Sequence, residues 1–312
     1  MSEYDVVVVG AGNAACCAAL AAAEHGARVL VLERASQSES GGNSRFTAGA
    51  IRFAYDGVDD LVALMPDLTE SEIAATDFGS YTEAQFYDDR GRVTDYRTDP
   101  ELASYLVSES KPTVLWMQQN VVRFAPIWGR QAFKVDGKCK FWGGLTVEAW
   151  GGGEGLVDAL HGSLGDKGIE IRFGVAAKSL IFDGSAVHGI VGRQDGEAVE
   201  IRASSVVLSA GGFQANTEWR TRYLGPGWDL SKVRGTRFNT GDGIKMALDI
   251  GAMPYGNWSG AHAVAWEYNA PEFGDLAVDG DLLNGCGNPD CTDDDIFELA
   301  NGCICCTVAD DF

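Results

Sequence analysis

The first 33 residues constrain the possible folds of this chain more than any other stretch. Tyr4 to Val9 is a β-branched run with the pattern of a buried parallel strand. Gly10 to Ala15 follows at once and opens an alanine-rich stretch that favours a helix. Gly26 stands where a helix C-cap belongs, and Arg28 to Leu32 is a second strand, which runs into Glu33. This order predicts a βαβ unit of about 30 residues and therefore an α/β fold.

Each position of the turn has a physical role if the unit binds a dinucleotide. Gly10 permits the tight turn, and Gly12 lets the backbone approach a pyrophosphate, which the free N–H groups of the following helix attract. Ala15 takes the third small position of the pattern. Glu33 lies at the expected reach for hydrogen bonds to a ribose 2′-OH and disfavours a 2′-phosphate. The motif predicts an adenine dinucleotide without distinguishing FAD from NAD, and an ordinary glycine turn is the alternative.

The charge balance excludes several kinds of partner. The chain carries 24 Lys and Arg against 45 Asp and Glu, a formal net charge of −21. Nucleic acids and anionic membrane surfaces both select for Lys and Arg, so we expect neither as a partner. The most apolar helical run, Ala11 to Ala23, is too short to span a bilayer, and the acidic N-terminus is unlike a signal peptide. We therefore expect no transmembrane segment and a cytoplasmic location.

A second group of small residues follows the second strand. It comprises Gly41 to Ser44 and then Thr47 to Gly49. Small residues here would let the chain run beside a cofactor, and Asn43 and Ser44 offer hydrogen bonds. A plain loop rich in Gly, Ser and Asn is the alternative interpretation.

These residues together resemble the flavoprotein subunits of the fumarate reductase/succinate dehydrogenase family. The G-x-G-x-x-A pattern, the Glu that ends the second strand, and the G-G-N-S and A-G segments are typical of that group. Three further segments agree with the family. Gly174 to Ala176 resembles the family's strand that meets the adenine, and Ser205 to Gly212 resembles its second glycine turn. Asn239 to Gly243 resembles its T-G-D-G loop. The likeness covers about residues 1 to 275 and implies a Rossmann-like FAD-binding domain followed by a capping domain.

The resemblance identifies FAD as the cofactor and implies which residues bind it. Gly10, Gly12 and Glu33 would hold the adenosine diphosphate half, and the T-G-D-G loop would close over the cofactor. The implied set is Gly10, Gly12, Asn13, Ala14, Glu33, Arg34, Gly41, Gly42, Asn43, Ser44, Ala48, Gly49, Val175, Ala176, Ala210, Gly211, Thr240, Gly241, Asp242 and Gly243.

Within the family, residues 42–50 and 141–150 resemble FAD-dependent tricarballylate dehydrogenases. This implies oxidation of a small polycarboxylate, tricarballylate to cis-aconitate, in which a base removes a proton and the flavin accepts a hydride. It also implies a partner protein that accepts the electrons. His262 lies past the T-G-D-G loop, where the family places a substrate-carboxylate ligand, and is the candidate substrate ligand. The other histidines are expected at helix ends or turns, in surface positions: His25, His161 and His188.

Residues 272 to 312 do not continue like a flavoprotein. Cys303, Cys305 and Cys306 place three thiols within four residues, which suits zinc or a similar divalent ion, although a redox-active cysteine run is the alternative. The segment resembles part of the CobW family of metal-handling GTPases, whose hallmark is N-G-C-I-C-C-T. The phosphate-binding loop G-x-x-x-x-G-K-[ST] occurs nowhere in the sequence, so we do not expect the tail to bind GTP.

The two resemblances meet at Glu272 to Leu276, which fits both families. They predict an incomplete FAD-binding domain over 1–245, a truncated start of the capping domain over 246–271 and a short, acidic, Cys-rich CobW-like fragment over 272–312. Family members continue well beyond this point and there supply the Arg that transfers the proton, so no catalytic acid or base is assigned. We therefore expect weak FAD binding or none, and no turnover. A metal-binding module carried by the tail and a non-functional fusion of two gene fragments are the alternatives.

The middle of the chain shows local signals of its own. Asp99 and Pro100 form the N-cap and first position of a helix expected to run to about Ser110. Residues 122–142 suggest a β-hairpin that turns at Asp136 and Gly137, and residues 169–208 suggest strands with two Asp-Gly turns.

Overall fold

The computed structural model describes residues 3–141, 143–265, 271–274 and 304–307. The chain folds into two compact units, which we call unit 1 (residues 1–46 and 160–312) and unit 2 (residues 47–159). Unit 2 lies inside the range that the sequence predicted as one FAD-binding domain, and no sequence signal indicated it. The predicted boundaries at 245 and 271 stay predictions.

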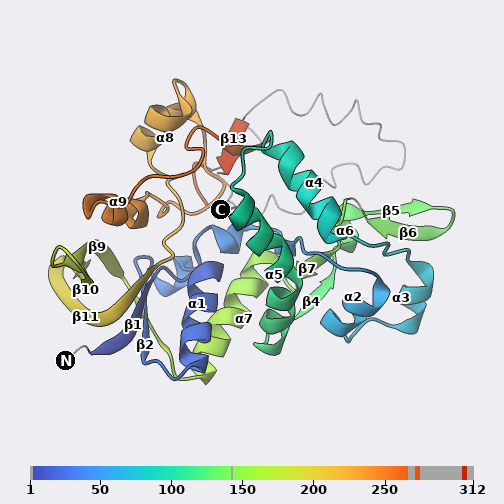
Figure 1. The fold of residues 1–312 in the computed structure, drawn as a ribbon, viewed down its shortest axis with the longest axis horizontal. Coiled ribbons are helices and arrows are strands. Elements are labelled where there is room, and N and C mark those ends of the chain that lie inside the picture. The colour runs from blue at the N-terminus through green and yellow to red at the C-terminus, as the bar shows by residue number, and fades with distance from the viewer. Residues whose placement is uncertain (1–2, 142, 266–270, 275–303, 308–312) are drawn as a thin grey trace. The chain divides into compact units, whose positions relative to one another are not determined.

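Unit 1 is built on a six-stranded sheet with the order β8-β2-β1-β11-β10-β9 (Figure 1). β1 pairs in parallel with β2 and β11, and β2 in parallel with β8, whereas β10 runs antiparallel to β11 and β9. The strands of this sheet are β1 (Tyr4–Val9), β2 (Val29–Glu33), β8 (Glu170–Phe173), β9 (Val175–Phe182), β10 (Val187–Gln194) and β11 (Glu197–Leu208). The helices of unit 1 are α1 (Asn13–Glu24), α8 (Thr217–Leu224) and α9 (Asp242–Asp249), with the 3-10 turns η1 (Gln37–Glu39), η2 (Gly42–Phe46) and η3 (Trp228–Leu230).

The predicted βαβ unit is confirmed. β1, α1 and β2 follow one another in the order expected, and α1 packs on the sheet through Ala15, Ala19 and Leu20, all fully buried. Every residue of β2 is buried, as expected for a strand inside a parallel sheet covered on both faces. The fold is therefore α/β, with the glycine turn at the carboxyl end of β1.

The antiparallel strands β9, β10 and β11 lead the chain back to the glycine turn that follows β1. The expected Asp-Gly turns join β9 to β10 and β10 to β11, and both Asp195 and Gly196 adopt positive φ. The first half of β11 pairs with β10, where Ile201 faces Ile190, and its second half pairs with β1, where Val206 faces Val7. The end of β11 therefore lies beside the end of β1.

Unit 2 consists of helices and short strands. The helices are α2 (Val58–Leu64), α3 (Glu70–Ala75), α4 (Glu83–Val93), α5 (Pro100–Gln119) and α6 (Trp128–Gln131). β3 (Ala50–Ile51), β7 (Val147–Ala149) and β4 (Phe124–Pro126) form one sheet, and β5 (Ala132–Val135) with β6 (Lys138–Phe141) forms the predicted hairpin. α7 (Gly152–Asp166) begins in unit 2 and ends in unit 1.

The predicted end of α5 is wrong. Its start is as expected, because Asp99 accepts hydrogen bonds from the N–H groups of Glu101 (2.9 Å) and Leu102 (3.1 Å). The helix then continues past Ser110 and through Pro112 to Gln119. Three buried side chains on its inner face explain the extension, since their packing outweighs the hydrogen bond that proline removes: Val107, Val114 and Met117.

The tail contributes one short strand. β12 (His262–Ala265) pairs antiparallel with β13 (Ile304–Thr307), so that Ala263 lies opposite Cys306 along the backbone. Only the backbone of these two strands is described. None of the helices in the described part of the chain is long and apolar enough to cross a membrane. The cytoplasmic location stays a prediction.

Candidate cofactor site

The glycine turn is held between three strand ends. The Gly10 N–H donates to the carbonyl of Leu32 at 2.8 Å, and the Ser209 N–H donates to the carbonyl of Val9 at 2.9 Å. Gly10 has φ +110°, and a Cβ built on it would lie 2.3 Å from the carbonyl oxygen of Ser209. The position therefore requires glycine for both its backbone angle and its contact with the end of β11.

Glu33 fixes the turn from the end of β2. Its carboxylate is buried and accepts the Ala11 N–H at 3.0 Å with one oxygen and the Ala35 N–H at 2.8 Å with the other. Burial raises the pKa of Glu33, and the hydrogen bonds from Ala35 and Ala11 oppose that rise in part. Each oxygen keeps lone pairs beyond these contacts, so the carboxylate can still accept from a ligand hydroxyl, and the contact with a ribose stays a prediction.

The first turn of α1 meets the second glycine segment. The Asn13 N–H donates to the hydroxyl of Ser44 at 3.0 Å. A Cβ on Gly12 would lie 3.2 Å from the carbonyl oxygen of Gly41. The structure thus brings Gly12, Asn13, Gly41 and Ser44 together at the positive end of a helix, the place where backbone N–H groups bind anions.

The T-G-D-G loop is tied to the end of β2 by a charged cluster. One nitrogen of the Arg34 guanidinium donates to the Thr240 hydroxyl at 2.6 Å and to the Asp242 carboxylate at 2.7 Å. Lys178 adds a longer contact to Asp242, at 3.5 Å. Burial acts to raise the pKa of Asp242, but the Thr240 hydroxyl and the two cations outweigh it and hold that pKa below its usual value.

The same loop also packs against the segment that follows β11. The Gly241 N–H donates to the carbonyl of Gly212 at 3.0 Å, and the side-chain amide of Asn216 donates to the carbonyl of Thr240 at 3.0 Å. A Cβ on Gly243 would lie 3.1 Å from the Cβ of Ala210. Two loops that are some 30 residues apart in sequence therefore form one wall of the site.

Two buried side-chain amide nitrogens indicate whether these residues suit a bound ligand. Asn43 and Asn239 are 8% and 5% exposed, and neither Nδ2 has a hydrogen-bond partner among the described residues. The other end of the Asn43 amide is engaged, because its Oδ1 accepts the Thr236 N–H at 3.0 Å. A Cβ on Gly211 would lie 2.6 Å from the Asn239 Nδ2, and one on Gly42 would lie 3.9 Å from the Asn239 Oδ1. Buried donors without acceptors are costly, so these residues fit a ligand that offers acceptor atoms beside Gly42 and Gly211.

Sequence reasoning missed Asn239. It opens the N-T-G-D-G segment, but the motif directed attention to the four residues after it. No local pattern shows that its side chain is buried beside Gly211, because Gly211 lies 28 positions earlier in the chain.

The remaining predicted residues divide among three places. Val175 and Ala176 begin β9 beside the end of β2, since the Gly174 N–H donates to the carbonyl of Ala35 at 3.0 Å. Ala48 and Gly49 belong to unit 2, where a Cβ on Gly49 would lie 2.7 Å from the backbone of Gly152. Ala14 lies in the first turn of α1.

The substrate and metal predictions fall mostly outside the described residues. The side chain of His262 and those of Cys305 and Cys306 are not described, and Cys303 lies wholly outside the described part of the chain. Within the described residues, no group of three or more His, Cys, Asp or Glu side chains is placed to hold a metal ion. Zinc at the tail stays a prediction.

The expected place of two of the histidines at helix ends or turns is wrong, although the His188 side chain is 45% exposed and lies at the surface as predicted. His161 lies within α7 and not at its end, and its Nε2 lies 2.8 Å from the carbonyl oxygen of Ala11. His188 lies within β10, where its Nε2 is 2.6 Å from the Asp183 carboxylate. His25 is exposed at the C-terminal end of α1, as predicted. The periodicity of a helix with an apolar face does not show which polar residue on it reaches another element.

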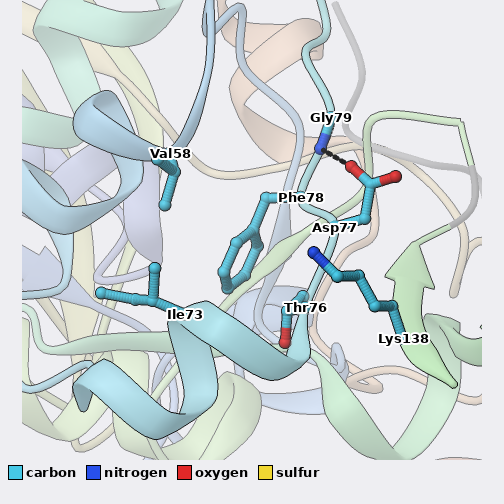
Figure 2. Close-up of a pocket in the computed structure, with 7 residues that line it drawn as sticks. All are labelled: Val58, Ile73, Thr76, Asp77, Phe78, Gly79 and Lys138. Carbon is cyan, nitrogen blue, oxygen red and sulfur yellow. Dashed lines mark hydrogen bonds between the residues drawn. The ribbon is translucent and has the colours of Figure 1, made fainter.

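Unit 2 contains hollows of its own, and none of the predicted cofactor residues lines them. Figure 2 shows one of about 270 Å³ beside α3, in which Val58, Ile73 and Phe78 form an apolar side while Asp77 and Lys138 bring charge to the other. The Asp77 carboxylate is already occupied by the Gly79 N–H (3.2 Å) and by Lys140 (2.9 Å). A neighbouring hollow of about 510 Å³ is lined by residues of the same segments. Neither arrangement points to a particular chemistry.

Comparison with known proteins decides the family. A family profile described as "FAD binding domain" matches residues 5–263. The chain belongs to this FAD-binding family. Vinyl phenol reductase of Lactiplantibacillus plantarum is 30% identical over 265 residues, which cover 81% of this chain and 47% of the reductase. The structure of the open conformation of a flavocytochrome c3 fumarate reductase has the same fold, with a TM-score of 0.62 at 24% identity over 84% of this chain and 41% of that one.

A second profile, described as "CobW/HypB/UreG, nucleotide-binding domain", matches residues 269–312. The zinc chaperone CobW of Sinorhizobium is 78% identical over 41 residues, which cover 13% of this chain and 12% of the chaperone. The resemblance to the flavoproteins is thus confirmed at the level of the FAD-binding family, and a short CobW-like segment is found at residues 269–312. The chain spans less than half of the length of each of these three proteins.

Proposed function

We propose that unit 1 binds FAD between the glycine turn of β1 and α1, the Gly41–Ser44 segment and the T-G-D-G loop. The observation that carries the proposal is the pair of buried amide nitrogens of Asn43 and Asn239, whose desolvation a bound group with acceptor atoms would offset. The α1 N-terminus favours an anionic group such as a pyrophosphate, and the Glu33 carboxylate can accept a ribose hydroxyl. Bound FAD would supply two-electron redox chemistry, and the protein residues would hold and orient it.

We further propose that the reaction is a dehydrogenation or reduction at a carbon–carbon bond of a small polycarboxylate. The family membership supports the flavin chemistry, and the relatives include a probable fumarate reductase and a urocanate reductase. The specific candidate is tricarballylate, oxidised to cis-aconitate, which rests on the sequence of residues 42–50 and 141–150. An electron-accepting partner protein belongs to this proposal. No acid or base is assigned among the described residues.

A titration tests the binding step. The purified apo-chain is titrated with FAD while the flavin fluorescence and the visible spectrum are followed, and the saturated protein is then mixed with tricarballylate and a redox dye. The proposal expects a saturable, yellow complex, whereas the sequence alone led us to expect weak binding and no turnover. Absence of saturation up to roughly 1 mM FAD, which corresponds to about −4 kcal/mol, would remove the proposal. Dye reduction that requires tricarballylate would establish the substrate.

A second candidate function concerns the tail. The identity of 78% over 41 residues to a zinc chaperone favours metal binding by Cys303, Cys305 and Cys306. Titration of the full chain with zinc or cobalt tests it, with a variant carrying Cys303→Ser, Cys305→Ser and Cys306→Ser as the comparison. Thiolate-to-cobalt absorption in the unmutated chain and not in the variant is the expected result, and equal spectra would rule this function out.

A further inference from the structure

The glycine turn has a second side-chain contact, which comes from far along the chain. The Nε2 atom of His161 lies 2.8 Å from the carbonyl oxygen of Ala11, across a sequence separation of 150 residues. His161 is half-buried in α7, and its ring packs against Phe173 of β8 with 6.2 Å between the ring centroids. Packing against β8 therefore holds the imidazole at the turn.

Side-chain contacts at Ala11 hold two successive peptide groups. The Ala11 N–H belongs to the Gly10–Ala11 peptide and donates to Glu33, and the Ala11 carbonyl belongs to the Ala11–Gly12 peptide and accepts from His161 at 2.8 Å and from the Cys16 thiol at 3.5 Å. The C=O and N–H of a trans peptide point in opposite directions, so the Gly12 N–H points away from His161. A peptide flip at this point would exchange that N–H for a carbonyl oxygen, which repels an anion.

We propose that His161 is a positioning residue for the anion-binding turn, one that holds the Ala11–Gly12 peptide with its N–H toward the pyrophosphate of the cofactor. This inference rests on the proposed binding of FAD. In this role His161 would act through the backbone of Ala11 and not by direct contact with the cofactor. A carbonyl can only accept, so Nε2 must carry the hydrogen in this contact. Protonation of the other ring nitrogen leaves that hydrogen in place, so the contact persists in both charge states of the imidazole.

Three variants separate this role from simple packing. His161→Leu places an apolar side chain at this position of α7 and removes the N–H donor to the Ala11 carbonyl. His161→Gln restores a donor N–H at a similar distance from the backbone. His188→Leu is the matched control, because His188 also lies in unit 1 but contacts only the surface carboxylate of Asp183 in the hydrogen bonds of the described residues.

The measured quantity is the dissociation constant for FAD, obtained by fluorescence titration of each apo-chain. We expect His161→Leu to weaken binding about tenfold, the effect of one net hydrogen bond, with His161→Gln recovering most of the loss and His188→Leu unchanged. Urea unfolding of the same samples reports stability separately. A residue that only packs α7 would lower the urea midpoint in both His161 variants and show no recovery of FAD affinity with Gln.

Nitrogen NMR of the histidine rings in the apo-chain tests the contact without any cofactor. The expected result is an Nε2–H imidazole at His161 with a slowly exchanging ring proton, and a neutral ring with its hydrogen on Nδ1 would overturn the proposal. If the unmutated chain does not bind FAD, the proposed function fails and this role fails with it. If the unmutated chain binds FAD and His161→Leu binds it equally well, only the role of His161 fails.

Discussion

Replacement of Gly10 by alanine tests a close contact between two backbone segments of the site. The added Cβ would lie 2.3 Å from the carbonyl oxygen of Ser209, 2.9 Å from its carbonyl carbon and 3.3 Å from the Cα of Ala210. All three are backbone atoms of the segment that leaves β11, so no side chain can turn aside to make room. The strand ends must separate, and the turn that carries the Ala11 and Gly12 peptides must move with them.

The matched control is Gly26→Ala. Gly26 also has a positive φ, +81°, but a Cβ there would meet no atom within 4 Å. Both substitutions restrict the unfolded chain equally, which stabilises by about 0.4–1 kcal/mol. Gly26→Ala then costs about 1–2 kcal/mol for a left-handed alanine, which leaves a net loss of roughly 0–1.5 kcal/mol.

Gly10→Ala adds two larger costs. A non-glycine residue at φ +110° costs about 1–3 kcal/mol, and the forced displacement of packed backbone costs about 1–3 kcal/mol more. The expected excess over Gly26→Ala is about 2 kcal/mol in unfolding free energy, or roughly 4–8 °C in Tm at 2–4 °C per kcal/mol. Urea and thermal unfolding followed by circular dichroism measure it, and FAD affinity should fall in parallel. If Gly10→Ala unfolds within about 0.5 kcal/mol of Gly26→Ala, the contact with Ser209 does not exist as described.

Three other predictions concern polar groups of the site. Asn239→Leu removes a buried donor and leaves no polar atom behind, so we expect FAD affinity to fall about tenfold in calorimetric titration while the urea midpoint does not fall. Arg34→Met should lower the unfolding free energy by about 1 kcal/mol, since the ion pair with Asp242 is partly exposed. The pKa of folded Asp242 lies below its usual 3.8, so the stability that the Asp242 carboxylate contributes is present above pH 3.8 and is lost as the pH falls through the folded pKa. In Arg34→Met the pKa of Asp242 should rise, and carboxyl NMR measures it. Burial raises the pKa of Glu33 above its usual 4.5, so its contribution to stability is present below pH 4.5 and is lost as the pH rises through the folded pKa, and Glu33→Gln should remove that slope from urea unfolding.

Each of these variants has a control at the surface. Asn257→Leu changes an exposed asparagine, whose Oδ1 accepts the Ser259 N–H at 3.1 Å, and should leave FAD affinity unchanged. Arg28→Met breaks an exposed ion pair with Asp5, 3.3 Å long, and should cost less than Arg34→Met. Glu39→Gln changes an exposed carboxylate and should leave the pH slope in place. Equal effects of a variant and its control would contradict the corresponding prediction.

The local elements of the FAD-binding part could be predicted because short-range signals specify them. The β-branched run, the glycine turn and the alanine-rich helix sit within one stretch of chain, and their spacing alone predicts β1, α1 and β2. Cap residues likewise predicted the start of α5 at Asp99, but its end depended on buried contacts and was predicted too early. The two Asp-Gly turns of the antiparallel strands were predicted for the same local reason.

The sequence by itself predicted an adenine dinucleotide, through the glycines and the acid at the end of the second strand, and indicated that the tail resembles part of another family. Only the tertiary structure decided which distant residues share the site: Arg34 with Asp242, Asn239 with Gly211, and His161 with Ala11. It also decided that residues 47–159 form a unit of their own. The physical reason is that periodicity and turn chemistry act over a few residues. Contacts across 30 to 200 positions follow from the order in which the strands pair and from which helix packs against them. A local sequence pattern predicts neither the strand order nor the packing of the helices.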